Sequence, residues 1–287
     1  MDYLRRDRLM TGTGAGAIDF DWLMEHVRVG WVPIEAPDAM DGEEPVLTFC
    51  LDAKALPAAE QFLLARYTLH QQVYLHKTTR CVEHMIAKLL RAVARHGGEP
   101  DTVGALTGLP ATHPLITFFG TRPDLAPDEG RRLELEKRAL ASYLLLDDMA
   151  IIGSLDKMRM AGDKVIADLA ARLQERRLYK TLDLAHYGQE EGVQRKHARR
   201  IDRVFAGKIE TEEVIKDEGA SISIYTRIGG DDERTHKKLH IVDAGKPAEI
   251  THLSPLVETL KDKKTYTRYY FEAESDRDAA RNPKGKP

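Results

Sequence analysis

The chain has 287 residues and a mass of 32.3 kDa, which is enough for one large domain or two modest ones. With 42% hydrophobic and 31% charged residues and a net charge of −3, it has the composition of a globular protein without the basic field that favours nucleic acid. Two cysteines without a CxxC pair argue against a disulfide framework, and no segment is apolar enough to span a membrane. We therefore expect a cytoplasmic protein that binds neither membrane nor nucleic acid.

Helices dominate the elements predicted for the first 190 residues. Residues 1–10 read as a helix that ends at a glycine-rich run, and Asp19 is placed to cap a second helix with Trp22 and Leu23 on its apolar stripe. Residues 30–33 and 46–51 predict a β-hairpin. The apolar spacing then predicts one long helix over 58–95 and two more over 129–150 and 158–176, with a strand over 178–184.

The composition changes after residue 186, where strands become more frequent. The sequence predicts a basic helix over 194–203, a strand over 221–228 with a return strand over 239–242, a helix that starts at Ser254-Pro255, and a last strand over 266–271. The predicted fold is mainly α. It consists of a helical domain over 1–190, a small α+β lobe over 191–272 and a disordered tail over 273–287.

Two segments carry side chains that suit a sugar-phosphate ligand. Tyr3 and Asp7 are four residues apart and share a helix face. On the long predicted helix, Arg66, His70, Tyr74 and Lys77 fall within an arc of about 80°. Arginine offers a bidentate fork and lysine a point charge for phosphate. The residues alone leave open a solvated helix edge, core packing of the tyrosines, or a structural ion pair between Asp7 and Arg66.

The segments Asp-Tyr-Leu-Arg-Arg-Asp (2–7) and Ala-Arg-Tyr-Thr-Leu-His-Gln-Gln-Val-Tyr-Leu-His-Lys (65–77) resemble two signatures of the HD-domain deoxynucleoside triphosphate triphosphohydrolases. Residues 222–227 resemble the C-terminal lobe of the animal member that joins a sterile-alpha-motif domain to an HD domain. The resemblance covers roughly residues 1–271. It implies a helical HD-type domain that hydrolyses a dNTP to deoxynucleoside and triphosphate by means of a metal-held hydroxide.

The resemblance also implies roles for individual residues. Four of them would bind the substrate: Tyr3 packs near the triphosphate, Asp7 accepts a hydrogen bond from the 3′-hydroxyl, Arg66 contacts the triphosphate, and Tyr74 lies against the 2′ position. Three others match positions at a regulatory nucleotide site at a subunit interface, which implies a homo-oligomer: Asp19, His76 and Lys77.

Two departures from the family pattern stand out. HD chemistry uses a histidine, a His-Asp pair and a later aspartate to hold a divalent metal, yet none of the 11 histidines is followed by aspartate. Trp22 stands where the animal enzyme has a triphosphate-binding arginine. We therefore expect a truncated portion of an HD phosphohydrolase that starts at an internal methionine. In this chain we expect no catalytic residue and no cofactor, with the metal held by the intact family member. The alternative is a non-catalytic nucleotide-binding or oligomerisation module.

Overall fold

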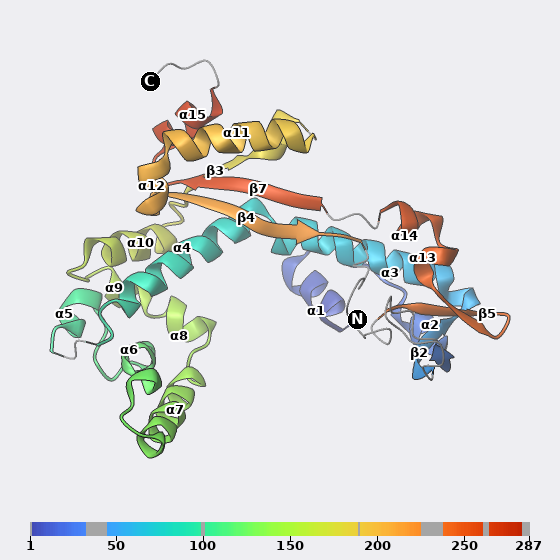
Figure 1. Ribbon diagram of the computed structural model, residues 1–287, viewed down its shortest axis with the longest axis horizontal. Helices are drawn as coiled ribbons and strands as arrows, with labels where there is room; N and C mark the ends of the chain where they lie inside the picture. Colours follow the sequence, from blue (N-terminus) through green and yellow to red (C-terminus); the bar gives the residue numbers. More distant parts are fainter. Residues whose placement is uncertain are drawn as a thin grey trace. The chain divides into compact units, whose positions relative to one another are not determined.

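The computed structural model describes residues 2–32, 45–98, 101–188, 190–224, 238–260 and 264–282 (Figure 1). Helices make up 59% of it and two small sheets complete the regular structure, which confirms the prediction of a mainly α protein with an α+β part. The chain divides into two compact units. Unit 1 comprises Met1–His76 and Glu218–Thr267, and unit 2 comprises Lys77–Asp217 and Arg268–Pro287. In the described residues, no helix has both the length and the apolarity to cross a membrane.

Unit 1 combines short helices with a four-stranded sheet in the order β1-β2-β5-β6. Strands β1 and β2 pair antiparallel, from Val27 opposite Leu51 to Val32 opposite Val46, which confirms the predicted hairpin. Strand β5 joins β2 in parallel and β6 in antiparallel orientation. The elements of unit 1 are α1 (Asp2–Thr11), α2 (Phe20–Glu25), β1 (Val27–Val32), β2 (Val46–Asp52), η1 (Ala53–Ala55), α3 (Leu56–Leu69), η2 (His70–Tyr74), β5 (His240–Asp243), β6 (Lys246–Glu249), α13 (Ile250–Leu253) and α14 (Pro255–Thr259).

Two local signals in unit 1 act as the sequence predicts. The Asp19 side chain accepts a hydrogen bond from the Trp22 amide at the start of α2, and Ser254 accepts one from the Val257 amide at the start of α14. Each cap satisfies an amide that the first turn leaves without a helical partner. The helices then bury one face against the sheet, and the core contains Leu23, Leu51, Leu63, Ile241 and Val257.

Unit 2 is mostly helical, and Figure 1 shows α4 and α10 side by side in it. Its elements are α4 (Lys77–Ala94), α5 (Val103–Thr107), α6 (Pro114–Gly120), η3 (Pro123–Leu125), α7 (Glu129–Tyr143), α8 (Asp148–Ile152), α9 (Leu155–Met158), α10 (Lys164–Gln174), β3 (Lys180–Asp183), η4 (Leu184–Tyr187), α11 (Glu191–Val204), α12 (Ala206–Glu210) and α15 (Glu274–Arg281). Strands β4 (Val214–Ile222) and β7 (Lys264–Phe271) begin in one unit and end in the other.

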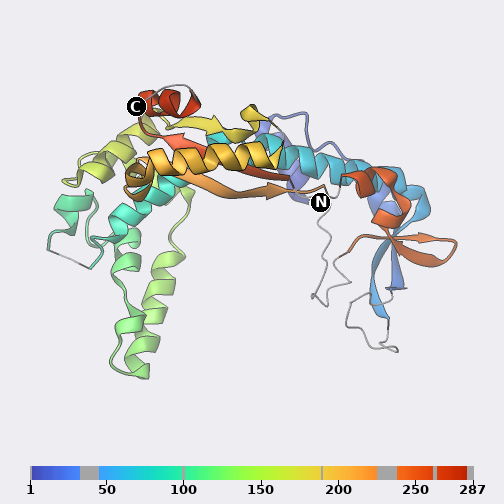
Figure 2. The ribbon, with the colours of Figure 1, turned by 45° about the horizontal axis from the view of Figure 1, so that its top comes forward.

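Unit 2 has two apolar cores. The larger one gathers the apolar face of α4 with α10, and includes Met85, Leu89, Ile166 and Leu169. The smaller one packs α11 and α15 against the sheet β3-β7-β4, whose layers are visible in Figure 2. Tyr269, Tyr270 and Phe271 of β7 are fully buried, so this strand serves both cores. Their burial anchors β7 next to β3, where Lys180 pairs with Phe271.

The three long predicted helices are each interrupted. The predicted helix 58–95 is two helices, α3 and α4, with the turn η2 between them. Asp147 caps α8 through the Ala150 amide and so separates α8 from α7, and Asp163 caps α10 through the Val165 and Ile166 amides. Each capping carboxylate sets the start of the helix that follows it, and the helix before it has already ended, at Tyr143 and at Met158. The apolar spacing continues across these breaks, so the sequence predicted one helix where the structure has two.

The C-terminal predictions need three corrections. Strand β4 ends at Ile222 and belongs to the three-stranded sheet, whereas β5 pairs with β2, so 221–228 and 239–242 are not two strands of one hairpin. Residues 225–237 lie outside the described residues. Residue 190 lies inside unit 2, whose first segment runs from Lys77 to Asp217. Residues 274–281 of the predicted disordered tail form helix α15, whose Ala280 is buried.

Candidate functional site

The end of α3 carries the residues that the sequence singled out. Helix α3 passes into a π-helical turn, η2, in which the Leu75 amide donates to the His70 carbonyl at 2.8 Å. Such turns widen a helix locally and occur often at functional sites. Lys77 then begins α4 in the second unit. The predicted arc of Arg66, His70, Tyr74 and Lys77 on one continuous helix is therefore wrong, because the turn changes the angular spacing and Lys77 starts another helix.

Within unit 1 the structure brings Tyr3, Asp7 and Tyr74 together. The Tyr74 hydroxyl donates a short hydrogen bond to Oδ2 of Asp7 across 67 residues of sequence. Burial raises the pKa of Tyr74 above its ordinary value, and the hydrogen bond to Asp7 and the neighbouring Tyr3 hydroxyl raise it further. Tyr74 thus keeps its proton at neutral pH and acts as a donor toward the carboxylate.

Arg66 stands on α3 one helical turn before His70, and we call Arg66, His70, Tyr74 and Asp7 the Arg66–Asp7 row. The His70 ring packs edge-on against Tyr74 with ring centroids 4.8 Å apart. Burial lowers the pKa of His70, and the charge of Arg66 lowers it further, so the imidazole is neutral at pH 7. The row therefore runs from Arg66 through His70 and Tyr74 to Asp7. His70 was not assigned a role from the sequence, although its place between Arg66 and Tyr74 was visible there.

A cavity of unit 1 lies along a different face of α1. It measures about 880 Å³ and is lined by Arg5, Arg6, Arg8, Asp19 and Phe20, among others. Counting ~100° per residue, Tyr3 and Asp7 point more than about 100° away from the cavity-lining Arg5 and Leu9. The guanidinium of Arg5 stacks over the Phe20 ring at 4.8 Å. This cavity combines cations with an aromatic ring, but it does not include the Asp7–Tyr74 pair.

The three predicted regulatory residues have separate surroundings. Asp19 is the α2 cap and also lines the cavity along α1. The side chains of His76 and Lys77 are exposed, and the His76 amide donates to the Val73 carbonyl. Lys77 lines a cavity of unit 2.

That cavity of unit 2 is strongly basic. It has a volume of about 690 Å³, and its wall carries two carboxylates, Glu272 and Glu274, against six cationic side chains: Lys77, Arg172, Arg176, Arg177, Lys180 and Arg277. Arg176 has a left-handed backbone with φ of 55°. Arg176 directly follows the end of α10. Its amide donates to the Leu173 carbonyl and the Arg177 amide donates to the Arg172 carbonyl, so the left-handed backbone closes the helix. The sequence reasoning missed this cluster, although Arg176-Arg177 and Lys180 stand close together in the chain.

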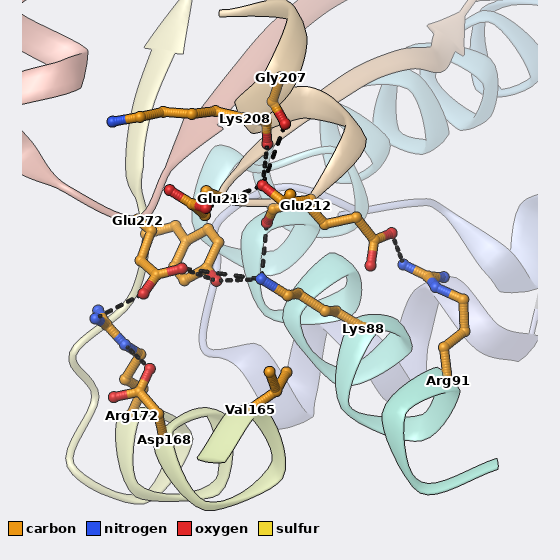
Figure 3. Close-up of polar contacts among 12 residues, drawn as sticks. Lys88, Arg91, Val165, Asp168, Arg172, Gly207, Lys208, Glu212, Glu213 and Glu272 are labelled. Atoms are coloured by element: carbon orange, nitrogen blue, oxygen red, sulfur yellow. Dashed lines mark hydrogen bonds and ion pairs between the residues drawn. The ribbon is translucent and has the colours of Figure 1, made fainter. Parts of the chain in front are cut away.

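A buried polar network forms one side of the basic cavity (Figure 3). The Tyr179 hydroxyl donates to Oε2 of Glu272 at 3.0 Å, and Arg172 donates to Oε1 of the same carboxylate at 3.3 Å. Lys88 donates to the Tyr179 hydroxyl at 3.1 Å and to the Glu212 carbonyl at 2.9 Å. Burial lowers the pKa of Lys88, and the charges of Glu272 and Glu212 oppose this effect. The network fixes Glu272 and Arg172, so both enter the cavity as oriented charges.

The described residues do not offer a ligand set for a divalent metal. Within the described ranges, no group of three or more histidine, cysteine, aspartate or glutamate side chains comes together. Asp7 is the carboxylate of the Arg66–Asp7 row, and it accepts the hydrogen bond from Tyr74. A hard cation needs several oxygen or nitrogen ligands at once, so this row fits an organic ligand better than a metal.

A family model described as HD associated region matches residues 44–104 and 131–270, which is most of the chain. The chain belongs to the HD-associated region family. The match includes α3 with Arg66, the π-helical turn with Tyr74, and most of the residues around the basic cavity. In this HD-associated chain, the Arg66–Asp7 row and the basic cavity are the two candidate binding sites.

Individual proteins resemble the chain over nearly all of its length. The uncharacterized protein YwfO of Bacillus subtilis (strain 168) is 22% identical over 300 residues, a match that covers 100% of this chain and 58% of YwfO. The fold is similar to that of a phosphohydrolase from Bacteroides thetaiotaomicron, with a TM-score of 0.62, 21% identity and coverage of 95% of this chain and 60% of the other. A hypothetical protein from Aquifex aeolicus gives a TM-score of 0.60 at 20% identity, covering 97% and 55%. The chain thus spans less than two thirds of each of these relatives.

Proposed function

We propose that the chain is the substrate-binding portion of an HD-superfamily phosphohydrolase and that its Arg66–Asp7 row binds a deoxynucleoside triphosphate. The observation that carries the proposal is the contact between Tyr74 and Asp7, which joins two segments 67 residues apart. A carboxylate accepts several hydrogen bonds, so Asp7 can accept one from a sugar 3′-hydroxyl while it accepts one from Tyr74. The membership of the HD-associated region family and the likeness to a phosphohydrolase fold support the reaction class.

In this proposal each side chain has a binding role and none is catalytic. Arg66 supplies a guanidinium to the triphosphate, and a guanidinium pairs with two phosphate oxygens at once. In the proposed complex Tyr3 and Tyr74 pack their rings against the ligand, and Tyr74 lies against the sugar's 2′ position. Neutral His70 supports the Tyr74 ring from the side. The divalent metal of HD chemistry has no ligand set in the described residues, so the proposed contribution of this chain is binding and orientation.

The test is calorimetric titration of the full chain with each dNTP and with the matching ribonucleotide. We expect dNTP binding that exceeds ribonucleotide binding by about tenfold or more, because a single lost or clashing hydroxyl contact changes affinity by 1.4 kcal/mol or more. Asp7→Asn and Arg66→Gln should each weaken binding by a similar factor, while Arg28→Gln, on β1 outside the row, leaves it unchanged. Equal binding of both nucleotide types, or variants that bind like the wild type, would refute the proposal.

Turnover assays of the same protein separate the proposal from its alternative. With Mn²⁺ or Mg²⁺ we expect far less than ~1 s⁻¹, the lower end of ordinary enzymes. A chain that binds no nucleotide but assembles with itself would instead favour the alternative, a non-catalytic oligomerisation module. A chain with ordinary turnover would contradict the assignment of binding roles alone.

The basic cavity of unit 2 supports a second binding function, for a regulatory nucleotide or another polyphosphate. Its excess of cations fits a polyanion. Inorganic tripolyphosphate is the simplest probe. We expect its affinity to fall with ionic strength and to drop about tenfold in Arg176→Gln and in Lys180→Gln. The control is Arg195→Gln, which removes an exposed cation of α11 that pairs with Glu191. Tripolyphosphate binding that ignores salt and both substitutions would refute this function.

A further inference from the structure

Helix α7 presents two apolar sides, and only one of them is covered. It packs on α6, as Figures 1 and 2 both show, and the side toward α6 includes the buried Ser142 and the half-buried Leu135. Counting ~100° per residue, Leu133, Leu140 and Leu144 fall within about 40° of one another on the opposite side. These leucines are 51%, 56% and 73% exposed. The helix thus carries an outward leucine stripe that no described residue of the chain covers.

The stripe has the spacing of a helix–helix seam. Leu133, Lys137, Leu140 and Leu144 alternate by four and three residues, which keeps them on one line along the helix. A single lysine inside such a seam lowers stability but selects how two helices align. This pattern differs from that of an ordinary solvated helix, where charged residues occupy the outward face.

We propose that a second copy of this chain covers the stripe, by antiparallel packing of the two α7 helices about a two-fold axis. An axis between Glu136 and Lys137 makes Glu136 of each copy face Lys137 of the other. The same axis places Leu133 of each copy opposite Leu140 of the other, so the central apolar and charged residues match, while Leu144 faces Glu129. A two-fold interface requires this kind of self-complementary surface. In a parallel pair each residue would meet its own copy, so Lys137 would face Lys137.

The ends of the helix extend the same complementarity. Leu145 and Met149 follow α7 and are 65% and 73% exposed, and Leu125, which precedes α7, is 70% exposed. Antiparallel packing brings Leu125 of one copy toward Leu145 and Met149 of the other. At these exposures each Leu-sized side chain offers on the order of 100 Å², so the six apolar side chains supply roughly 600 Å² per copy. A stable interface uses about 800 Å² per partner, and the polar rim of α7 supplies the remainder.

The first experiment measures the association of the full chain by sedimentation equilibrium over roughly 1–100 µM, a range in which a standard-sized interface is detectable. We expect a dimer whose dissociation constant rises about 100-fold or more in Leu140→Asp, because each copy loses a central apolar contact and buries a charge. Met160→Asp is the matched control, because Met160 is 83% exposed in the same unit but lies outside α7. A monomer throughout the range, or a dimer that Leu140→Asp leaves intact, would overturn the proposal.

Charge exchange tests the pairing without a change in apolar surface. Glu136→Lys and Lys137→Glu should each weaken the dimer, because each creates like charges across the axis. The double variant restores opposite charges and should restore dimerisation. Glu136→Lys also breaks the exposed pair with Arg132, so recovery in the double variant is the informative result. Failure of the double variant to recover while both single variants weaken association would exclude this register.

Cysteine cross-linking decides the direction of the helices. Positions 133 and 140 on one helix are about 10.5 Å apart along the axis, too far for a disulfide within one chain. The double variant Leu133→Cys/Leu140→Cys should therefore form disulfide-linked dimers under mild oxidation, whereas each single variant should form them at least tenfold more slowly. The native Cys50 and Cys81 are buried and do not interfere. Single variants that cross-link as fast as the double variant would show parallel packing and overturn the antiparallel arrangement.

Discussion

Removal of one hydroxyl, in Tyr74→Phe, tests whether the Asp7–Tyr74 contact stabilises unit 1. The hydroxyl donates to a carboxylate, and hydrogen bonds to charged groups contribute about 1.5–3 kcal/mol. Both side chains are only half-buried, so water can partly replace the bond, and we expect a loss of about 1.5 kcal/mol, the lower end of that range. With a urea slope of about 2 kcal/mol per M, the unfolding midpoint should fall by roughly 0.7 M.

Tryptophan fluorescence follows this change directly. The two tryptophans of the chain, Trp22 and Trp31, both belong to unit 1, so their emission reports the unfolding of the unit that contains the contact. The matched control is Tyr67→Phe on α3, whose hydroxyl accepts a hydrogen bond from the neutral Gln71 amide at 2.8 Å. A neutral pair contributes about 1 kcal/mol, so the control should shift the midpoint less.

Two results would refute the reasoning about Tyr74. A midpoint unchanged within error would show that water compensates for the lost hydrogen bond completely. A larger shift in Tyr67→Phe than in Tyr74→Phe would show that the charged contact has no special weight. The Tyr74→Phe protein should also bind dNTP with altered affinity, because the ring remains but Asp7 loses its donor.

Two further predictions concern unit 2, and far-UV circular dichroism in urea measures both. Gly108 has φ of 75°, and an added Cβ would lie 2.2 Å from the Lys157 carbonyl oxygen. Gly108→Ala should therefore lower the free energy of unfolding by about 3 kcal/mol or more. The control Gly98→Ala, where an added Cβ meets open space, should change it little. Asp217 is buried against Arg80, so Asp217→Asn should cost about 3 kcal/mol at pH 7. Burial alone would raise the pKa of Asp217, but hydrogen bonds from its cationic partners outweigh burial and hold the pKa well below its usual range. The unfolded state therefore binds the proton more readily than the folded state. The stabilisation by ionised Asp217 is present above about pH 4 and is lost as the pH falls further. The Asp217→Asn variant should lack this pH dependence.

Local features of the chain were predictable because short-range contacts decide them. The Asp19 and Ser254 caps, the pairing of residues 27–32 with 46–52 and the helix over 191–204 follow from residues close in sequence. A capping oxygen needs an amide two or three residues away, and a hairpin needs alternating strands near a turn. The sequence therefore determined these caps, this hairpin and this helix.

Long-range pairing was decided only by the tertiary structure. Parallel pairing of β2 with β5 joins residues about 190 apart, and no local pattern distinguishes β5 from the return strand of a hairpin. The π-helical turn at His70–Tyr74 depends in the same way on what packs around it, because a wider turn is unfavourable on its own. The composition of the units is also a long-range outcome, because unit 2 joins Lys77–Asp217 with Arg268–Pro287.

The same distinction holds for the candidate sites. The sequence supplied the residue types and, through a family resemblance, the names Tyr3, Asp7, Arg66 and Tyr74. Only the fold shows that Asp7 and Tyr74 touch, and only the fold gathers Lys77, Arg172 and Arg277 around one cavity. Helical periodicity fixes the face on which a side chain stands, since that depends on backbone geometry within a few residues. Which two faces meet depends on the packing of the whole core, and one sequence read in local windows carries no signal of that packing.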